Sequence, residues 1–193
     1  MASNVVFRVA RGLQEAGLAV VRFNFRGVGQ SQGPLATAGS LEDPIGEVDD
    51  LRAVLQWSAG EHPGLELWAG GYSFGARVAA RVATHAAEGD EHVRRTLLVA
   101  PPVRVTPLDD LERLACPGLV LMAGGDAFGT QADIQAKFPG LPRSLELDEL
   151  PDTDHSFEGA LTGLQQRVRD WAARSLAQRV HEESGPAPQE TGS

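Results

Sequence analysis

The sequence predicts an α/β fold, in which a mostly parallel β-sheet carries helices on both of its faces. The main observation is that the apolar period alternates along the chain between the helical and the strand-like kind. The strand-like runs are also apolar almost throughout, as in parallel strands that are covered on both faces. The length of 193 residues fits one domain, and no internal repeat is visible.

The first predicted element is a helix that Asn4 caps and Gly17 ends. Its inner face comprises Val5, Val6, Val9, Leu13 and Ala16. A strand is predicted next, at Leu18–Phe25, followed by a glycine-rich loop over 26–33. The loop glycines do not have the G-x-G-x-x-G spacing, so a phosphate cradle is not expected there.

The remaining elements alternate in the same way. Asp43 and Pro44 suit a helix start, and the inner face of that helix would comprise Ile45, Val48, Leu51, Val54 and Leu55. Further strands are predicted at 65–69, 96–100, 119–123 and 144–147, and helices at 74–87 and 131–138. A final helix carries Leu161, Leu164, Val168, Trp171 and Leu176 at helical spacing. We expect a domain over 1–181 and a disordered tail over 182–193.

Composition limits the function classes. The net charge is −9 with both signs mixed along the chain, which argues against nucleic acid or an anionic membrane as a partner. Cys116 is the only cysteine, so neither an internal disulfide nor a multi-cysteine zinc site is possible. No signal peptide and no apolar run of membrane-spanning length is visible, and a cytoplasmic location is expected.

One short motif carries a specific chemistry. Residues 71–75 read Gly-Tyr-Ser-Phe-Gly and match G-x-S-x-G, between a predicted strand and a predicted helix. A tight turn there exposes the hydroxyl of Ser73 and strains its backbone, and it requires small residues at Gly71 and Gly75. Ser73 is therefore the candidate nucleophile, which needs a base beside it.

His155 is the candidate base. It is the one histidine of the five that follows a predicted strand and precedes the final helix. The carboxyl ends of parallel strands share one edge of a sheet, so this loop lies on the same side as Ser73. The other histidines lie near helix ends, in a helix-to-strand turn or near the tail.

Asp126 is the candidate acid that orients the base. It lies just past the strand at 119–123, and it gives the chain order Ser, Asp, His. Asp133, Asp148 and Asp154 are weaker alternatives. Asp154 adjoins His155, but neighbouring side chains seldom meet in the required geometry.

Four segments together resemble the α/β-hydrolase superfamily, near the dienelactone-hydrolase-like and serine-aminopeptidase-like groups. They are residues 23–33, the elbow at 71–75, the acid turn at Gly125-Asp126 and the histidine loop at 154–157. The resemblance implies a compact, lidless serine hydrolase with an oxyanion donor at the backbone N–H of Phe74. Tyr72, Arg26, Phe128 and Phe157 are candidate pocket residues. No metal or organic cofactor is implied.

The chain departs from that family at its N-terminal end. It lacks the strand that lies between the family's fourth and fifth strands, and the loop that provides the second oxyanion donor. The strands predicted at 18–25 and 65–69 would then flank a gap or pair directly. We expect either a native protein that is longer at its N-terminus or a non-catalytic form, and the intact triad favours the first.

The sequence therefore predicts a hydrolase (EC 3.1) that cleaves a small carboxylic ester or related acyl substrate through Ser73, His155 and Asp126. Two alternatives remain open: a non-catalytic α/β-hydrolase-like binding or scaffold protein, and a peptidase or thioesterase with the same triad. The acyl group, the leaving group and the oligomeric state are not predicted.

Overall fold

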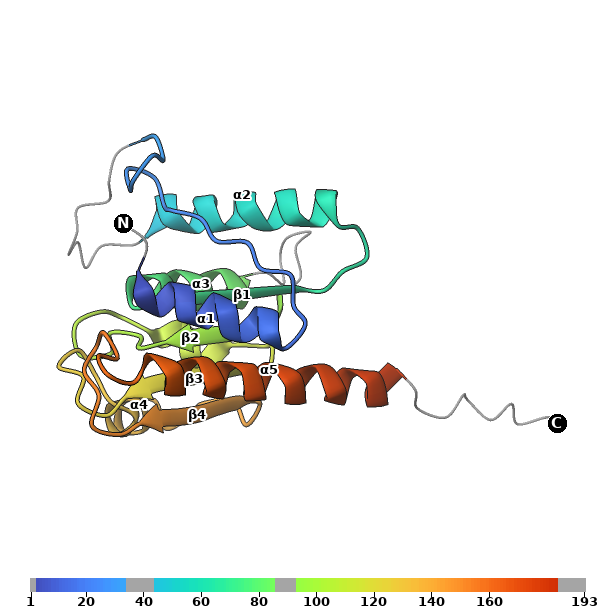
Figure 1. The fold of residues 1–193 in the computed structure, drawn as a ribbon. Helices are drawn as coiled ribbons and strands as arrows, with labels where there is room; N and C mark the ends of the chain where they lie inside the picture. Colours follow the sequence, from blue (N-terminus) through green and yellow to red (C-terminus); the bar gives the residue numbers. More distant parts are fainter. Residues whose placement is uncertain (1–2, 34–43, 86–92, 184–193) are drawn as a thin grey trace.

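The computed structural model describes residues 3–33, 44–85 and 93–183, and within them the fold is a parallel sheet between two layers of helices (Figure 1). The sheet has four strands in the order β1-β2-β3-β4. The strands are β1 (Leu67–Tyr72), β2 (Val93–Val99), β3 (Gly118–Ala123) and β4 (Leu145–Leu150). All three pairings between neighbours are parallel, so the predicted fold class is confirmed.

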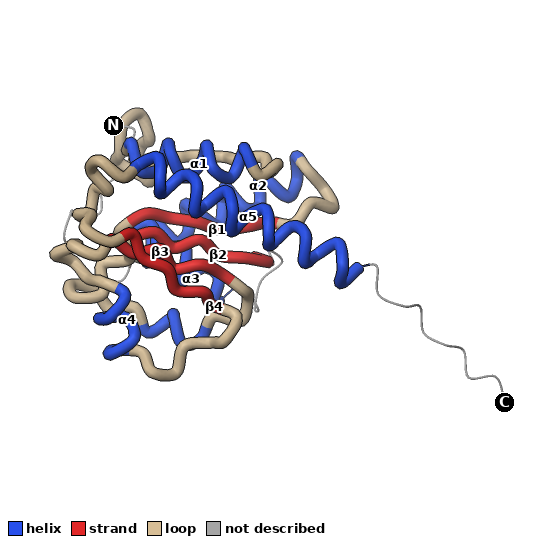
Figure 2. Tube along the Cα trace, turned by 60° about the horizontal axis from the view of Figure 1, so that its bottom comes forward, coloured by secondary structure: helices blue, strands red, loops and turns tan. Residues whose placement is uncertain are grey.

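The two faces of the sheet are covered by different helices (Figure 2). One face carries α1 (Asn4–Glu15) and α5 (Leu161–Glu183), which lie side by side. The other carries α2 (Ile45–Glu61), α3 (Phe74–His85), α4 (Gln131–Lys137) and the 3₁₀-helix η2 (Asp109–Arg113). Among the described helices, none combines the length and the apolar character that a bilayer span requires.

The strand β3 is apolar throughout because both of its faces are buried. In β3, Leu119 and Leu121 pack against the α1/α5 layer, whereas Val120 and Met122 pack against the α2/α3 layer. Successive side chains of a strand point to opposite faces, so an unbroken apolar run is needed to fill both cores.

The strand predicted at Leu18–Phe25 is absent, and this prediction is wrong. The segment has no strand pairing, and in Figure 1 it runs between α1 and α2. Its side chains Val21 and Phe23 are 48% and 37% exposed. A strand is stable only with a hydrogen-bonded neighbour, and β1 is the edge strand of the described sheet. The segment therefore neither pairs with β1 nor forms a strand of its own.

Several element boundaries differ from the predicted ones. Ser3, not Asn4, caps α1, with its side chain accepting from the N–H of Val6. Ile45 was predicted on an inner helix face but is 66% exposed. The helix α5 includes residues 182 and 183, two residues beyond the predicted domain end, while the rest of the predicted tail and Asp43 lie outside the described residues.

Candidate active site

Ser73 lies in the turn between β1 and α3, at the carboxyl end of its strand. Its φ is +55°, a left-handed conformation that is costly for a residue with a side chain. The turn is held to the sheet by the Ser73 N–H, which donates to the carbonyl O of Val99 at 2.8 Å. The structure therefore has the strained turn that the sequence predicts for Ser73.

The two motif glycines are not equally constrained. A Cβ at Gly71 would lie 2.0 Å from the carbonyl O of Gly75, so no larger residue fits. A Cβ at Gly75 would meet only Phe25 Cε2, at 3.8 Å, which is an ordinary contact. The predicted requirement for a small residue holds at Gly71 but not at Gly75.

Asp126 lies in the loop after β3, and its side chain is fully buried. Its Oδ1 accepts a hydrogen bond from the Phe128 N–H at 2.8 Å. Its Oδ2 lies 2.7 Å from Nδ1 of His155. A carboxylate that is buried with both oxygens bonded is held in one orientation.

His155 lies in the loop between β4 and α5, with its side chain 20% exposed. Its Nδ1 contacts Asp126, and its Nε2 lies 2.8 Å from Oγ of Ser73. With Nδ1 donating to the carboxylate, Nε2 is left to accept from the serine hydroxyl. The structure thus brings together three side chains from the three loops that the sequence singled out.

Two aromatic rings flank the imidazole of His155. The Tyr72 ring lies 5.1 Å away at an angle of 32°, and the Phe128 ring 4.8 Å away at 73°, edge to face. Burial raises the pKa of the Tyr72 phenol above its ordinary value, and the nearby Asp126 charge raises it further. The Phe128 side chain is 43% exposed, so it can contact a bound substrate.

The other predicted site residues differ in their surroundings. Phe157 is fully buried in the core against α5, so the prediction that it forms a pocket wall is wrong. The Arg26 guanidinium binds Asp50 of α2 through both Nε and Nη2, which ties the 18–33 segment to α2. Phe74 is the first residue of α3, where backbone N–H groups have no partner within the helix.

Sequence reasoning missed Arg104. Its backbone N–H donates to the Phe128 carbonyl at 2.9 Å, and its Nη1 contacts the carbonyls of Asp126 and Ala127 at 3.4 and 3.3 Å. Its Nη2 also pairs with Asp133 at 2.8 Å. Arg104 therefore braces the loop that carries Asp126. The only signal in the sequence was its place in a loop after a predicted strand.

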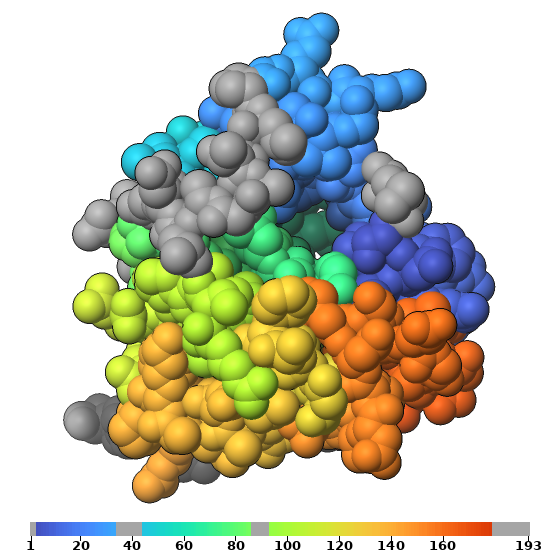
Figure 3. Space-filling view, turned by 90° about the vertical axis from the view of Figure 1, so that its left-hand side faces the viewer, coloured from blue at the N-terminus to red at the C-terminus, as the bar shows by residue number. Residues whose placement is uncertain are grey.

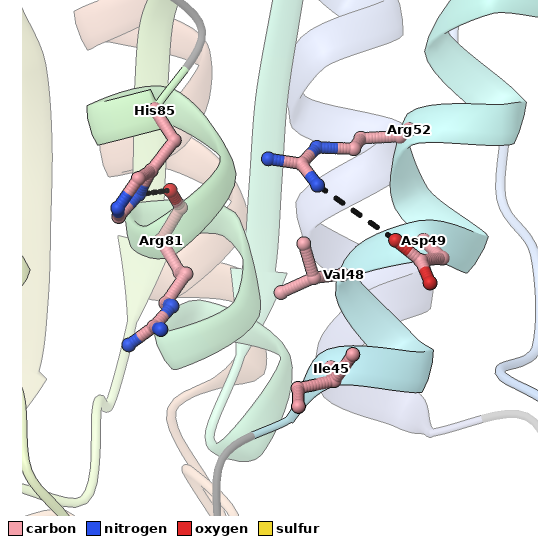
Figure 4. Close-up of a pocket in the computed structure, with 6 residues that line it drawn as sticks. All are labelled: Ile45, Val48, Asp49, Arg52, Arg81 and His85. Carbon is pink, nitrogen blue, oxygen red and sulfur yellow. Dashed lines mark hydrogen bonds and ion pairs between the residues drawn. The ribbon is translucent and has the colours of Figure 1, made fainter.

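Figure 3 shows the side of the molecule at which the strands have their carboxyl ends. The surface there is hollowed between three parts: the light blue residues that lead up to residue 33, the dark blue helix α1, and the green residues around the elbow. A separate hollow of about 140 Å³ lies between α2 and α3 (Figure 4). In it Arg52 pairs with Asp49, and His85 Nδ1 lies 2.9 Å from the Arg81 carbonyl.

Another hollow, of about 310 Å³, lies over β4 and α5 and has a largely charged lining. None of Ser73, Asp126 and His155 lines it or the hollow between α2 and α3. Among the described residues, no group of three or more His, Cys, Asp or Glu side chains could hold a metal ion.

Comparisons with known proteins agree with this geometry. The sequence matches the family Hydrolase_4, described as serine aminopeptidase S33, over residues 1–124. It is 31% identical over 139 residues to an uncharacterized protein of Rickettsia prowazekii, a match that covers 70% of this chain. The match covers 54% of the rickettsial protein, so the chain spans about half the length of this relative.

Two solved structures are similar over most of the chain. An α/β serine hydrolase homologue from Coxiella burnetii is 34% identical with a TM-score of 0.75, and the match covers 91% of this chain and 77% of that one. A lidless α/β serine hydrolase from Xanthomonas campestris is 33% identical with a TM-score of 0.76, with coverage of 91% and 75%. The chain therefore belongs to the serine aminopeptidase S33 family, and its fold is that of the α/β serine hydrolases.

Proposed function

We propose that this protein hydrolyses a small carboxylic ester or related acyl substrate, with Ser73 as nucleophile, His155 as base and Asp126 as the acid that orients the base. One observation carries the proposal: an unbroken chain of two hydrogen bonds, of 2.8 and 2.7 Å, runs from the Ser73 hydroxyl through the imidazole to the buried carboxylate. A serine hydroxyl becomes a useful nucleophile when a positioned base can take its proton.

The reaction proceeds in two halves. Ser73 Oγ forms a bond to the acyl carbon while its proton passes to Nε2 of His155, and Asp126 stabilises the resulting imidazolium. The tetrahedral intermediate collapses, the C–O bond to the leaving group breaks, and the imidazolium protonates the departing alcohol. Water, deprotonated by the same imidazole, then releases the acid from the acyl-enzyme and restores the serine.

The negative oxygen of the intermediate needs hydrogen-bond donors. The Phe74 N–H is the donor that the sequence predicts, and the N-terminus of α3 favours negative charge at the same place. Loss of one donor of such a pair costs a factor of about 10²–10³ in turnover. We favour esters over amides as substrates, because an alcohol is a better leaving group than an amine.

Covalent labelling tests the proposal. A fluorophosphonate probe should label the wild type and should not label Ser73→Ala, because the probe captures only an activated serine. A matched control is Ser58→Ala, whose hydroxyl donates to the Val54 carbonyl within α2 and lies outside the site. Failure of the folded wild-type protein to label would contradict the proposal and favour a non-catalytic binding role.

Peptide hydrolysis is the second candidate, because the matching family is described as serine aminopeptidase. A panel of p-nitrophenyl esters, thioesters and aminoacyl p-nitroanilides separates the possibilities. We expect the highest kcat/KM for an ester. A higher value for an aminoacyl anilide would instead assign the site to peptides.

A further inference from the structure

Tyr72 joins the two loops that carry Ser73 and His155. It is the last residue of β1 and directly precedes Ser73. Its hydroxyl donates to the backbone carbonyl of His155 at 2.9 Å. The Tyr72 side chain therefore connects the strand end next to Ser73 to the backbone of His155.

The neighbouring residues of the His155 loop are held by other bonds. The Thr153 carbonyl accepts from the Gly125 N–H at 2.7 Å, and the Asp154 carboxylate accepts from the Glu158 N–H at 3.0 Å. These bonds hold the residues on either side of His155, while the Tyr72 hydroxyl binds the backbone of residue 155 itself. Its ring also packs on the imidazole, 5.1 Å from centroid to centroid.

The phenol remains a donor over the pH range in which hydrolases act. Burial is the main cause of its raised pKa, and the negative charge of Asp126 adds to it. A protonated phenol donates to a carbonyl, whereas a phenolate would repel it.

We propose that Tyr72 is a positioning residue, whose hydroxyl holds the backbone of His155 where Nε2 meets Oγ of Ser73. This inference rests on the proposed function and adds a further residue to it. The competing interpretation is that Tyr72 serves only to pack the core, since its ring also contacts the apolar cluster under α1 and α5. The two interpretations differ in the expected effect of removing the Tyr72 hydroxyl while keeping its ring. Only the positioning role predicts a loss of activity.

The substitution Tyr72→Phe separates them, because it keeps the ring and removes the donor. We expect kcat for p-nitrophenyl acetate to fall about 5- to 20-fold with KM within about twofold of wild type, because small misplacements of a catalytic group cost rate rather than binding. The rate of fluorophosphonate labelling should fall by the same factor. Tyr72→Leu, which also removes the ring, should lower both rates further.

The matched control is Thr84→Val. It deletes a hydroxyl that donates to the carbonyls of Ala80 and Asp110, at 2.9 and 3.1 Å, far along α3 from the site. It should lower Tm slightly and leave kcat unchanged. If Tyr72→Phe behaves like this control, the positioning role is overturned, whereas a wild type that does not label overturns the proposed function itself. If Tyr72→Leu does not fold, the comparison of Tyr72→Phe with Thr84→Val still decides.

Discussion

At the scale of single residues, the site depends on a buried charge that is fully bonded. The carboxylate of Asp126 has no exposed surface and accepts one hydrogen bond at each oxygen, from the Phe128 N–H and from His155. With a donor at each oxygen, the carboxylate is held in one orientation. The same bonds set which nitrogen of the imidazole faces Ser73.

Asp126→Asn should therefore lower kcat/KM for an ester by a factor of about 10³–10⁴, because an amide cannot stabilise the imidazolium and can favour the wrong tautomer. Steady-state kinetics with p-nitrophenyl acetate measures the loss. Asp49→Asn, on α2 with its side chain 59% exposed, is the control and should keep full activity. A loss of less than tenfold for Asp126→Asn would mean that another acid orients the base.

The two glycines of the elbow should respond differently to alanine. Gly71→Ala places a Cβ 2.0 Å from a backbone oxygen, and we expect it to lower the free energy of unfolding by about 3 kcal/mol and to abolish labelling. Gly75→Ala makes only an ordinary contact, and its unfolding free energy should stay within about 0.5 kcal/mol of wild type. Urea denaturation measures both, and equal effects would contradict the structure of the turn.

The ionisation of Tyr72 can be observed alone, because it is the only tyrosine of the chain. Burial and the Asp126 charge should place the pKa of its phenol above 10.0, and Asp126→Asn should lower it. A raised pKa in the folded state gives stability that is complete below the ordinary value and is lost as pH rises through the raised one. Spectrophotometric titration of the phenolate measures it, and a midpoint at or below 10.0 would refute the burial argument.

At the scale of elements, the notable feature is that β1 has a pairing partner on one side only among the residues that the structure describes. The N–H of Ser73 donates toward β2, and the N–H groups of a strand alternate in direction. The N–H of Gly71 therefore points to β2 and that of Gly70 points to the open side, where Gly70 is exposed. In the described part of the chain, this unpaired edge ends with β1 at Tyr72, one residue before the candidate nucleophile.

Hydrogen exchange should distinguish these neighbouring amides. We expect the Gly70 amide to exchange at least about tenfold faster than the Gly71 amide, because only the second is bonded within the sheet. Each amide is the control for the other, since they share the same strand and similar solvent. Equal protection in an NMR exchange experiment would show that another segment pairs with β1.

At the scale of the whole molecule, the first and last helices of the described chain pack closely together. A Cβ at Gly12 of α1 would lie 2.6 Å from the Gln165 carbonyl and 3.2 Å from Val168 Cβ on α5. Glycine at this position therefore allows the two helix backbones to approach. The two helices, one from each end of the described chain, together cover one face of the sheet.

Gly12→Ala should lower the free energy of unfolding by about 1–3 kcal/mol, because the added carbon forces the two helices apart. Gly60→Ala is the matched control in α2, where nothing lies within 4 Å of the new carbon. That change should raise stability by about 0.5–1 kcal/mol, because alanine favours the helix. Thermal unfolding measures both, and a stabilising Gly12→Ala would contradict the close helix contact.

Much of this structure follows from local patterns in the sequence. The apolar runs of β2 and β3 and the turn at Ser73 are predictable, because side-chain burial and turn chemistry act over a few residues. The rule that parallel strands end at one edge also places Asp126 and His155 on the side of Ser73. Local patterns therefore determined the fold class and the three candidate residues.

The tertiary structure alone decided the rest, because those features depend on partners that are distant in sequence. Leu18–Phe25 has the composition of a strand but no hydrogen-bonded neighbour, and so it is not one. Phe157 lies two residues from His155 yet is buried in the core. Tyr72 reaches the site from the end of β1, and Arg104 reaches it from the loop after β2. A hydrogen bond or a buried contact requires two groups to meet in space. The pattern of a sequence segment describes one of these groups and does not identify its distant partner.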